Sequence, residues 1–235
     1  MELIVVGAGP GDPELITLKA LKALGRATVI LYDNLINRVL LEHARPDCLH
    51  IYVGKKPYGE YTPQEDIHQL ILDHARGGAV VVRLKGGDPF IFGRGMEEIL
   101  FARAHGIPAS YIPGITSMQA VGLEDIPLTH RDLAESVWIV TGTKKDGALS
   151  ADLRLALASH ATVVIYMGMK KLAEIASVYV SEGKGDMPAA IIQHASLPQQ
   201  RKVVGAVREL AAMATGAGLT HPAIIVIGAV AGLAL

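Results

Sequence analysis

The sequence predicts an α/β protein with two domains, a mostly parallel first sheet and a mixed second sheet. In the first half, short apolar runs alternate with amphipathic stretches of roughly 10–15 residues, which indicates strands joined by helices. Runs such as TVILY and VVVRL are continuously apolar, as is typical of strands buried on both faces. Turn-forming residues gather at 112–116, and a second series of apolar runs follows. We therefore expect one domain over 1–114 and another over 115–235.

The first domain is expected to alternate strands and helices along the chain. Thr62, Pro63 and Glu65 predict the start of one helix, because Thr and Glu three residues apart form a capping box and Pro favours the first helical turn. The predicted strands are 3–6, 27–32, 49–53, 79–84 and 109–112. The predicted helices lie near 14–25, 35–44, 63–76 and 95–105.

The second domain is expected to be less regular in its strand directions. The predicted strands lie near 136–141, 161–167, 187–193, 202–206 and 223–228. The polar segment 199–201 before the run KVVGAV indicates an antiparallel connection, so we predict a mixed sheet. The apolar run at 222–235 is shorter than the ~20 residues that a membrane-spanning helix needs, and we interpret it as a final buried strand.

The composition excludes several classes of protein. The chain has 22 Lys and Arg against 23 Asp and Glu, so it lacks the basic surplus of nucleic-acid-binding proteins. A single cysteine allows no internal disulfide and no cysteine-rich zinc site. Apolar residues make up 50% of the chain, which predicts a globular protein. The first residues do not resemble a signal peptide, and we expect a cytoplasmic protein without membrane contact.

The first glycine-rich segment, GAGPGDP at residues 7–13, lies between a predicted strand and a predicted helix. This position is typical of a dinucleotide-binding loop, with Asp33 as the acid that binds ribose. However, Asp12 replaces the third glycine of that pattern, and Pro10 and Pro13 have no N–H group to offer a phosphate. A turn that brings the backbone close to an uncharged or cationic ligand fits better. A tight strand–helix turn without a ligand is the structural alternative.

The second glycine-rich segment, RLKGGDPFIFGRG at residues 83–95, follows the fourth predicted strand. Ligands of parallel sheets bind beyond the carboxyl ends of the strands, and glycines allow a ligand to approach the backbone. The structural alternative is a loop whose phenylalanines fill a hydrophobic gap.

Three shorter motifs are PGITS at 113–117, IPLTHR at 126–131 and YMGM at 166–169. Each also has a purely structural interpretation: a helix cap, a solvated face and a core methionine, respectively. The chain contains no zinc-binding His spacing, no G-x-S-x-G motif and no P-loop. We therefore expect no metal, no serine hydrolysis and no phosphoryl transfer.

Taken in order, the motifs resemble those of uroporphyrinogen-III C-methyltransferases, within the S-adenosylmethionine-dependent tetrapyrrole methyltransferases. The segments that carry the resemblance are VGAGPGDPELITLKA, LYDNLI, YVGKK, VVRLKGGDPFIFGRG, IPGITS, IPLTHRD, VTG and YMG. The resemblance implies two α/β domains with the cofactor in the cleft between them, and a homodimer. It also implies methylation of uroporphyrinogen III at C2 and C7 to precorrin-2, the precursor of sirohaem, cobalamin and haem d1. The dehydrogenase–chelatase module of some relatives is expected to be absent.

The resemblance also implies roles for individual residues. The proton acceptor would be Asp33 and the proton donor Lys55, and Arg94 would act in catalysis and substrate binding. His130 and Arg131 would also bind substrate. The cofactor contacts would be Pro10, Gly86, Gly87, Asp88, Ile91, Thr116, Ser117, Met167, Ala195 and Ala223. At 194–196 this chain has His-Ala-Ser where the family has Asn-Gly-Thr.

The chemistry of the expected substrate agrees with these assignments. Its eight carboxylates are ionised at neutral pH and require a local basic surface. The candidates are Lys55, Lys56, Lys85, Arg94, His130, Arg131, Lys144 and Lys145. A proton must leave the macrocycle after methyl transfer, which a base such as Asp33 would accept. Two alternatives remain open at this point: a nicotinamide oxidoreductase, and a methyltransferase that acts on a later corrin carbon.

Overall fold

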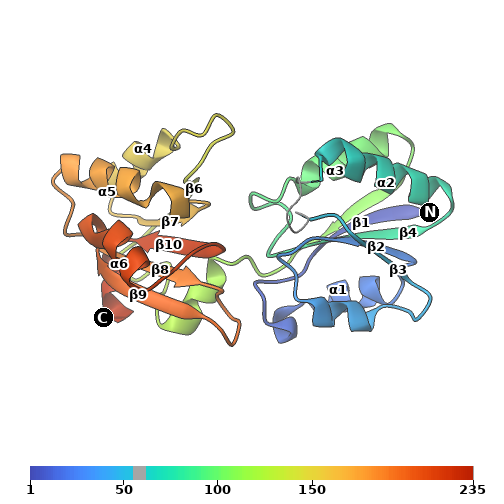
Figure 1. The fold of residues 1–235 in the computed structure, drawn as a ribbon, viewed down its shortest axis with the longest axis horizontal. Helices are drawn as coiled ribbons and strands as arrows, with labels where there is room; N and C mark the ends of the chain where they lie inside the picture. The colour runs from blue at the N-terminus through green and yellow to red at the C-terminus, as the bar shows by residue number, and fades with distance from the viewer. Residues whose placement is uncertain (55–61, 235) are drawn as a thin grey trace. The chain divides into compact units, whose positions relative to one another are not determined.

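The computed structural model describes residues 1–54 and 62–234 (Figure 1). The chain forms two compact units, Met1–Ser117 and Met118–Leu235. The division follows Ser117, whereas the sequence placed the boundary after residue 114. We describe each unit by itself.

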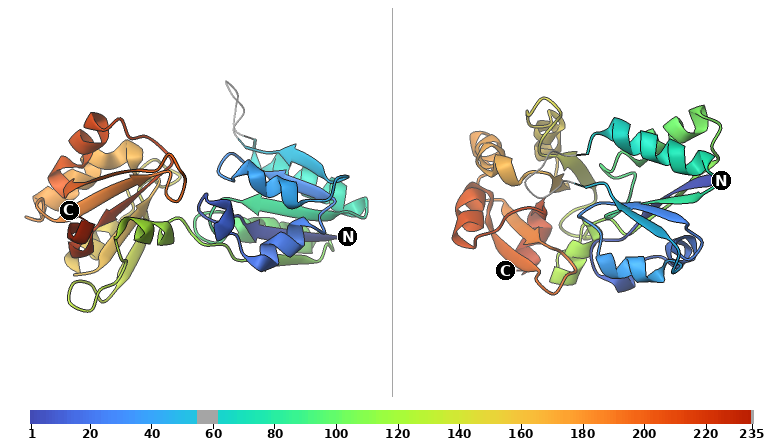
Figure 2. Two further views of the ribbon diagram at one scale, coloured as in Figure 1. Left: turned by 90° about the horizontal axis from the view of Figure 1, so that it is seen from below. Right: turned by 45° about the vertical axis from the view of Figure 1, so that its right-hand side comes forward.

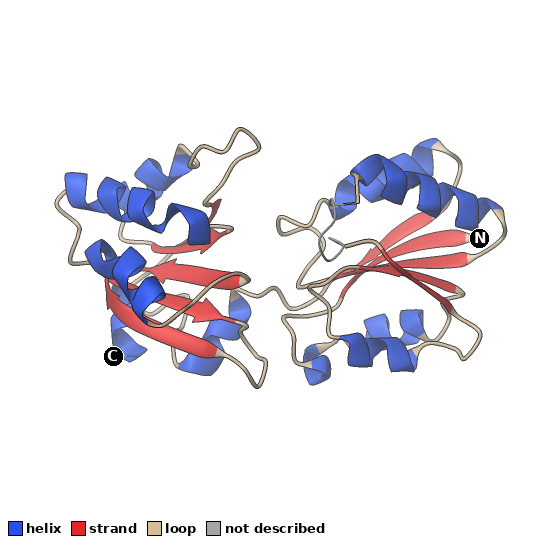
Figure 3. Ribbon diagram, viewed as in Figure 1, coloured by secondary structure: helices blue, strands red, loops and turns tan. Residues whose placement is uncertain are grey.

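The first unit contains a five-stranded sheet of order β3-β2-β4-β1-β5, in which all neighbours are parallel. Helices α2 and α3 cover one face, and α1 covers the other (Figures 1 and 3). Side chains of β1 alternate between the two layers, so both faces are buried and the strand is apolar from Leu3 to Val6. The strands are β1 (Glu2–Gly7), β2 (Val29–Tyr32), β3 (Leu49–Tyr52), β4 (Val80–Lys85) and β5 (Ala109–Ile112). The helices are α1 (Leu18–Leu24), α2 (Gln64–Arg76) and α3 (Gly95–Ala104).

Two helices predicted for this unit differ in the structure. The predicted helix 14–25 is split into a 3₁₀ turn, Pro13–Leu15, and α1, because Asp12 and Thr17 each cap a separate start. The predicted helix 35–44 is a 3₁₀ helix, Arg38–His43, whose first turn is capped by Asn37.

The capping box predicted at Thr62 is also wrong. Helix α2 begins at Gln64, with Pro63 at the N-cap position and no side-chain cap. The Thr62 hydroxyl instead donates a hydrogen bond to the Gly54 carbonyl, 3.2 Å away. Because the helix begins at Gln64, Thr62 lies one residue before the N-cap position, where its hydroxyl was expected.

The second unit contains a five-stranded sheet of order β6-β7-β10-β8-β9. The β6–β7 pair is parallel, and the other neighbouring pairs are antiparallel, which confirms the predicted mixed sheet. Helices α4, α5 and α6 cover one face, and 3₁₀ segments cover the other; Figure 2 shows these layers from two more directions. The strands are β6 (Val137–Thr141), β7 (Thr162–Tyr166), β8 (Pro188–Gln193), β9 (Arg201–Ala206) and β10 (Ala223–Ile227). The helices are α4 (Asp152–Ala158), α5 (Leu172–Ser181) and α6 (Leu210–Gly216), and the 3₁₀ segments are Gln119–Glu124 and Ala229–Ala234.

The directions of the strands place the loops that matter for function. Because the first sheet is parallel, the loops after β1, β2, β4 and β5 share its carboxyl edge. In the second sheet β6, β7 and β8 run the same way, and β10 runs against them. The carboxyl ends of β7 and β8 therefore lie at the edge where β10 begins. No helix within 1–54 or 62–234 is both long and apolar enough to span a membrane.

Candidate functional site

The two glycine-rich loops of the first unit meet at the carboxyl edge of its sheet. Strand β1 lies between β4 and β5, so the loops that follow these three strands are neighbours. Gly9 and Gly87 form a small antiparallel bridge, with N···O distances of 3.3 Å and 2.7 Å. The segments 7–13 and 83–95 therefore form one structure, although they are far apart in the sequence.

Three glycines at this edge, Gly7, Gly87 and Gly114, bring three backbones into direct contact. A Cβ atom on Gly114 would lie 2.3 Å from the Gly87 carbonyl oxygen, and one on Gly7 would lie 2.4 Å from the Gly114 nitrogen. Gly86 is also required for packing, since its Cβ would lie 2.7 Å from the Leu35 Cβ. Gly87 differs from these, because a Cβ there would meet nothing closer than 3.7 Å. Its φ of +64° still favours glycine.

We expect Gly114→Ala to destabilise the protein by about 2 kcal/mol or more, because the added methyl group must push two backbones apart. Gly216→Ala is the matched control. Its Cβ would meet no atom within 4 Å at the end of α6, so this variant should be unchanged or slightly more stable. Urea unfolding of both variants is the measurement. Equal stability of the two variants would contradict the close contact.

Asp88 holds the second glycine-rich loop against β5. It is buried, and its Oδ1 accepts a hydrogen bond from the Phe90 amide at 2.8 Å. Its Oδ2 accepts from the Tyr111 hydroxyl at 2.5 Å and from the Gly114 amide at 3.1 Å. Burial, followed by the bond to Asp88, raises the pKa of Tyr111, so this phenol remains a donor. The Tyr111 ring also stacks on Phe90 at a centroid distance of 3.8 Å.

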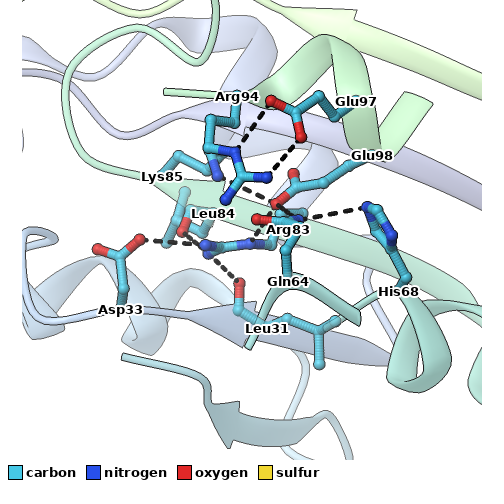
Figure 4. A network of polar contacts seen from close by, with 10 residues as sticks. All are labelled: Leu31, Asp33, Gln64, His68, Arg83, Leu84, Lys85, Arg94, Glu97 and Glu98. Carbon is cyan, nitrogen blue, oxygen red and sulfur yellow. Dashed lines mark hydrogen bonds and ion pairs between the residues drawn. The ribbon is translucent and has the colours of Figure 1, made fainter. Parts of the chain in front are cut away.

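A buried ionic network lies next to this edge (Figure 4). Arg83 donates from Nε to Glu98 Oε1 at 3.2 Å and from a terminal nitrogen to Asp33 Oδ2 at 3.2 Å. Its other terminal nitrogen donates to the carbonyl oxygens of Leu31 and Leu84. Lys85 Nζ also donates to Glu98 Oε1, at 3.1 Å. Burial, and then the Arg83 charge, lower the pKa of Lys85.

The expected role of Lys85 is wrong, and the position of Asp33 is now known. Lys85 was expected to contribute to an exposed basic surface, but its side chain is buried and paired with Glu98. Asp33 follows β2 at the carboxyl edge and remains partly exposed. Its Oδ1 accepts a hydrogen bond from the Leu35 amide at 3.0 Å, so both carboxylate oxygens are held.

Arg94 is exposed and pairs with Glu97 on the first turn of α3, as the dashed lines of Figure 4 show. Its Nε and a terminal nitrogen lie 2.9 Å and 2.6 Å from the two Glu97 oxygens. Two nitrogens of the guanidinium thus bind both oxygens of one carboxylate, the geometry in which Arg94 would also bind a substrate carboxylate. The backbone of Arg94 is left-handed, with φ of +58°, which is uncommon for a residue other than glycine.

In the second unit, three predicted cofactor contacts share one edge of the sheet. Met167 follows β7, Ala195 follows β8, and Ala223 begins β10, which is antiparallel to both strands. Met167 is exposed and left-handed, with φ of +54°. Met167 is therefore not a core methionine, whereas Met169 of the same motif packs against the core. Ala195 is buried, and Ala223 is partly buried.

The remaining predicted residues are distributed as follows. Pro10, Ile91 and Ser117 are partly exposed and Thr116 is buried, all in the three loops of the first edge. The following 3₁₀ helix, Gln119–Glu124, has Met118 at its N-cap position. In the second unit His130 is partly buried and accepts from the Asp132 amide through Nδ1, while Arg131 is exposed. Lys55 and Lys56 lie outside the described residues.

Glu98 and the structural role of Arg83 in the buried network were not predicted from the sequence. A signal for Arg83 was present, because a charged residue interrupts the apolar strand VVVRL. A weaker signal for Glu98 was its spacing, since it lies on the buried face of α3 together with Gly95, Ile99 and Ala102. Helical periodicity places these residues on one side of a helix.

The protein is an α/β protein of two units. In the first unit, the expected ligand contacts lie in loops that follow parallel strands. The family model of the tetrapyrrole (corrin/porphyrin) methylases matches residues 2–211. The chain belongs to this family. The matched residues make up most of both units, and they include every residue expected at the site except Ala223.

Curated relatives include two siroheme synthases. That of Chromobacterium violaceum is 45% identical over 98% of this chain and 49% of its own length. That of Neisseria meningitidis serogroup B is 47% identical over 97% of this chain and 47% of its own length. The chain therefore spans about half the length of these relatives.

Solved structures include the uroporphyrin-III C-methyltransferase of Thermus thermophilus complexed with S-adenosylhomocysteine. It is 40% identical, with a TM-score of 0.83, and the match covers 99% of this chain and 100% of that one. A cobalt precorrin-4 methyltransferase of cobalamin biosynthesis is 27% identical with a TM-score of 0.87, over 98% of this chain and 95% of that one.

Proposed function

We propose that this protein transfers methyl groups from S-adenosylmethionine to C2 and C7 of uroporphyrinogen III, which yields precorrin-2. The observation that carries this proposal is the match to the Thermus thermophilus enzyme, which covers nearly all of both chains and was solved with the demethylated cofactor. The siroheme synthase relatives support the same substrate.

The residues at the two edges fit a cofactor without phosphate groups. Pro10 and Pro13 have no backbone N–H group to offer a phosphate. The Asp12 carboxylate caps the turn that follows. No atom crowds the Gly87 backbone, since a Cβ there would lie 3.7 Å from the nearest atom, the Ser117 nitrogen, and a glycine lets a ligand approach the backbone. The proposed contacts are Pro10, Gly86, Gly87, Asp88, Ile91, Thr116 and Ser117 of the first unit, and Met167, Ala195 and Ala223 of the second.

S-adenosylmethionine supplies an electrophilic methyl group, and the macrocycle supplies an electron-rich carbon. The tasks left to the protein are alignment, exclusion of water and removal of a proton after the new carbon–carbon bond has formed. We assign the removal of the proton to Asp33, whose carboxylate is held in place but partly exposed. Lys55 is the proposed proton donor, and Arg94, His130 and Arg131 are proposed to bind substrate carboxylates.

An assay of the product tests this function directly. The protein is incubated without oxygen with uroporphyrinogen III and methyl-labelled S-adenosylmethionine, and the product is analysed by mass spectrometry. We expect a labelled product that is heavier by two methyl groups. An unlabelled substrate, with full cofactor binding retained, would favour a methyltransferase of a later corrin carbon, which the fold of the cobalt precorrin-4 enzyme also allows. Binding of NADH instead of S-adenosylhomocysteine would favour the oxidoreductase alternative.

Gly87→Ala is expected to weaken S-adenosylhomocysteine binding by about tenfold or more, because the methyl group occupies the space beside the backbone. Gly106→Ala is the matched control. It has a similar positive φ of +75° and no atom within 4 Å of its Cβ, so it carries the same backbone strain away from the edge. Isothermal calorimetry should show normal affinity for the control. Normal affinity for both variants would remove Gly87 from the cofactor site.

We further propose a cytoplasmic homodimer, as in the family that the sequence resembles. Sedimentation equilibrium at micromolar concentration should give about twice the chain mass of 24.9 kDa. A mass equal to that of one chain would contradict the dimer without affecting the proposed reaction.

A further inference from the structure

The network around Glu98 contains one buried atom whose role the proposed reaction does not explain. The Glu98 side chain is completely inaccessible, and its Oε1 accepts hydrogen bonds from Arg83, Lys85 and Gln64. Its Oε2 is buried and has no hydrogen-bond partner among the described residues. Burying a carboxylate costs free energy, and an unsatisfied oxygen adds to that cost. Packing alone would be served better by an apolar residue at this position.

Arg83 connects Glu98 to Asp33. Its Nε donates to Glu98, and one terminal nitrogen is fixed by the carbonyl oxygens of Leu31 and Leu84. The other terminal nitrogen is thereby aimed at Asp33 Oδ2, 3.2 Å away (Figure 4). Since the guanidinium is planar and rigid, fixing two of its nitrogens also fixes the third. Glu98 therefore determines where Arg83 donates its hydrogen bond to Asp33.

The same arrangement has an electrostatic consequence. An arginine beside a carboxylate favours the ionised form and makes the carboxylate a weaker base. Glu98 offsets this effect, because its negative charge lies on the opposite side of the same guanidinium. The other charged or titratable groups near the network are Lys85 on β4, Glu65 and His68 on α2, Glu97 on α3 and Arg94 before it.

We propose that Glu98 is a positioning residue that acts through Arg83 to orient Asp33 and to keep it basic enough to accept a proton. The proposal rests on the proposed function, in which Asp33 is the proton acceptor. Glu98 itself touches neither substrate nor cofactor in this scheme. It needs no exposure to act, which agrees with its complete burial.

The test measures the pKa of Asp33 directly, by carbon NMR of protein labelled at its aspartate carboxyl groups, with Asp33→Asn used to assign the signal. In Glu98→Gln, which keeps the shape but removes the charge, we expect the pKa of Asp33 to fall by about 0.5–1 unit. In Lys85→Met, which removes a positive charge, we expect this pKa to rise. Glu97→Gln is the matched control, because Glu97 is exposed on the same helix and pairs with Arg94; here the pKa of Asp33 should stay unchanged.

The pH dependence of kcat/KM provides the functional readout. A base must be deprotonated to act, so the acidic limb of the profile should move to lower pH in Glu98→Gln and to higher pH in Lys85→Met. An unchanged pKa of Asp33 in Glu98→Gln would overturn the proposal, and if that variant does not fold, Glu98→Asp, which draws the carboxylate away from Arg83, decides it by the same measurement. A wild-type rate for Asp33→Asn together with shifted pKa values would instead overturn the role of Asp33 as base. The two failures are therefore distinguishable.

Discussion

Asp33→Asn is expected to slow methyl transfer by about 10²–10⁴-fold, the usual cost of losing a general base. The substitution keeps the shape of the side chain, and the asparagine oxygen can still accept the Leu35 amide. It replaces the oxygen that accepts from Arg83, but that guanidinium keeps Glu98 and two carbonyl oxygens. The fold should therefore survive, and the affinity for S-adenosylhomocysteine should be close to that of the wild type.

Single-turnover rates with labelled cofactor are the measurement, and calorimetry establishes that the variant still binds the cofactor. Asp47→Asn is a suitable control. Asp47 is largely exposed and pairs only with Arg45 among the described residues, at a point before β3. If Asp33→Asn reacts as fast as this control, Asp33 serves only to hold its turn and to pair with Arg83.

Arg94→Ala is expected to lose about 2–5 kcal/mol of transition-state binding, as when one partner of a desolvated charge pair is removed. In the structure its fork is engaged by Glu97, an exposed residue. A substrate carboxylate would have to displace Glu97, which is feasible because exposed pairs of this kind are weak. Arg94→Lys keeps the charge but loses the fork, so we expect an intermediate loss of kcat/KM.

Two further variants separate substrate binding from structure at this position. Arg94→Gly relieves the left-handed backbone, so it should be at least as stable as Arg94→Ala while losing as much activity. Glu97→Gln removes the ion pair with Arg94 and should not raise KM. A wild-type kcat/KM for Arg94→Ala would show that the pair with Glu97 is the whole role of Arg94.

The strands were predictable, because continuous apolar runs are the direct signature of sheets buried on both faces. Val5 and Val6 lie in opposite layers, so successive positions within β1 had to be apolar. The helices near 14–25 and 35–44 were mispredicted, because short polar side chains at Asp12, Thr17 and Asn37 start separate turns. Periodicity does not distinguish one interrupted helix from two short ones.

The sequence predicted which segments form the ligand loops, but it did not predict what each residue of these loops contacts. Gly86 and Gly87 are adjacent in the sequence, yet a Cβ on Gly86 would clash with Leu35, whereas a Cβ on Gly87 would make only ordinary contacts. That distinction depends on which distant segment of the chain packs against each glycine. Likewise, Glu97 and Glu98 are adjacent in the sequence, and the rotation of α3 about its axis decides that Glu97 pairs with Arg94 while Glu98 is buried.

The contact among Gly7, Gly87 and Gly114 also limits how this edge can be altered by evolution or by engineering. A loop exchanged from a relative must bring a glycine to the positions of Gly7 and Gly114, where a Cβ would clash with a neighbouring backbone, or the segments must be exchanged together. Residues 88–94 extend beyond the crossing, but Asp88 ties them to β5, and a Cβ on Gly93 would lie 2.6 Å from the Pro89 carbonyl oxygen. Libraries aimed at a different macrocycle should therefore vary 90–92 and leave the crossing, Pro89 and Gly93 untouched.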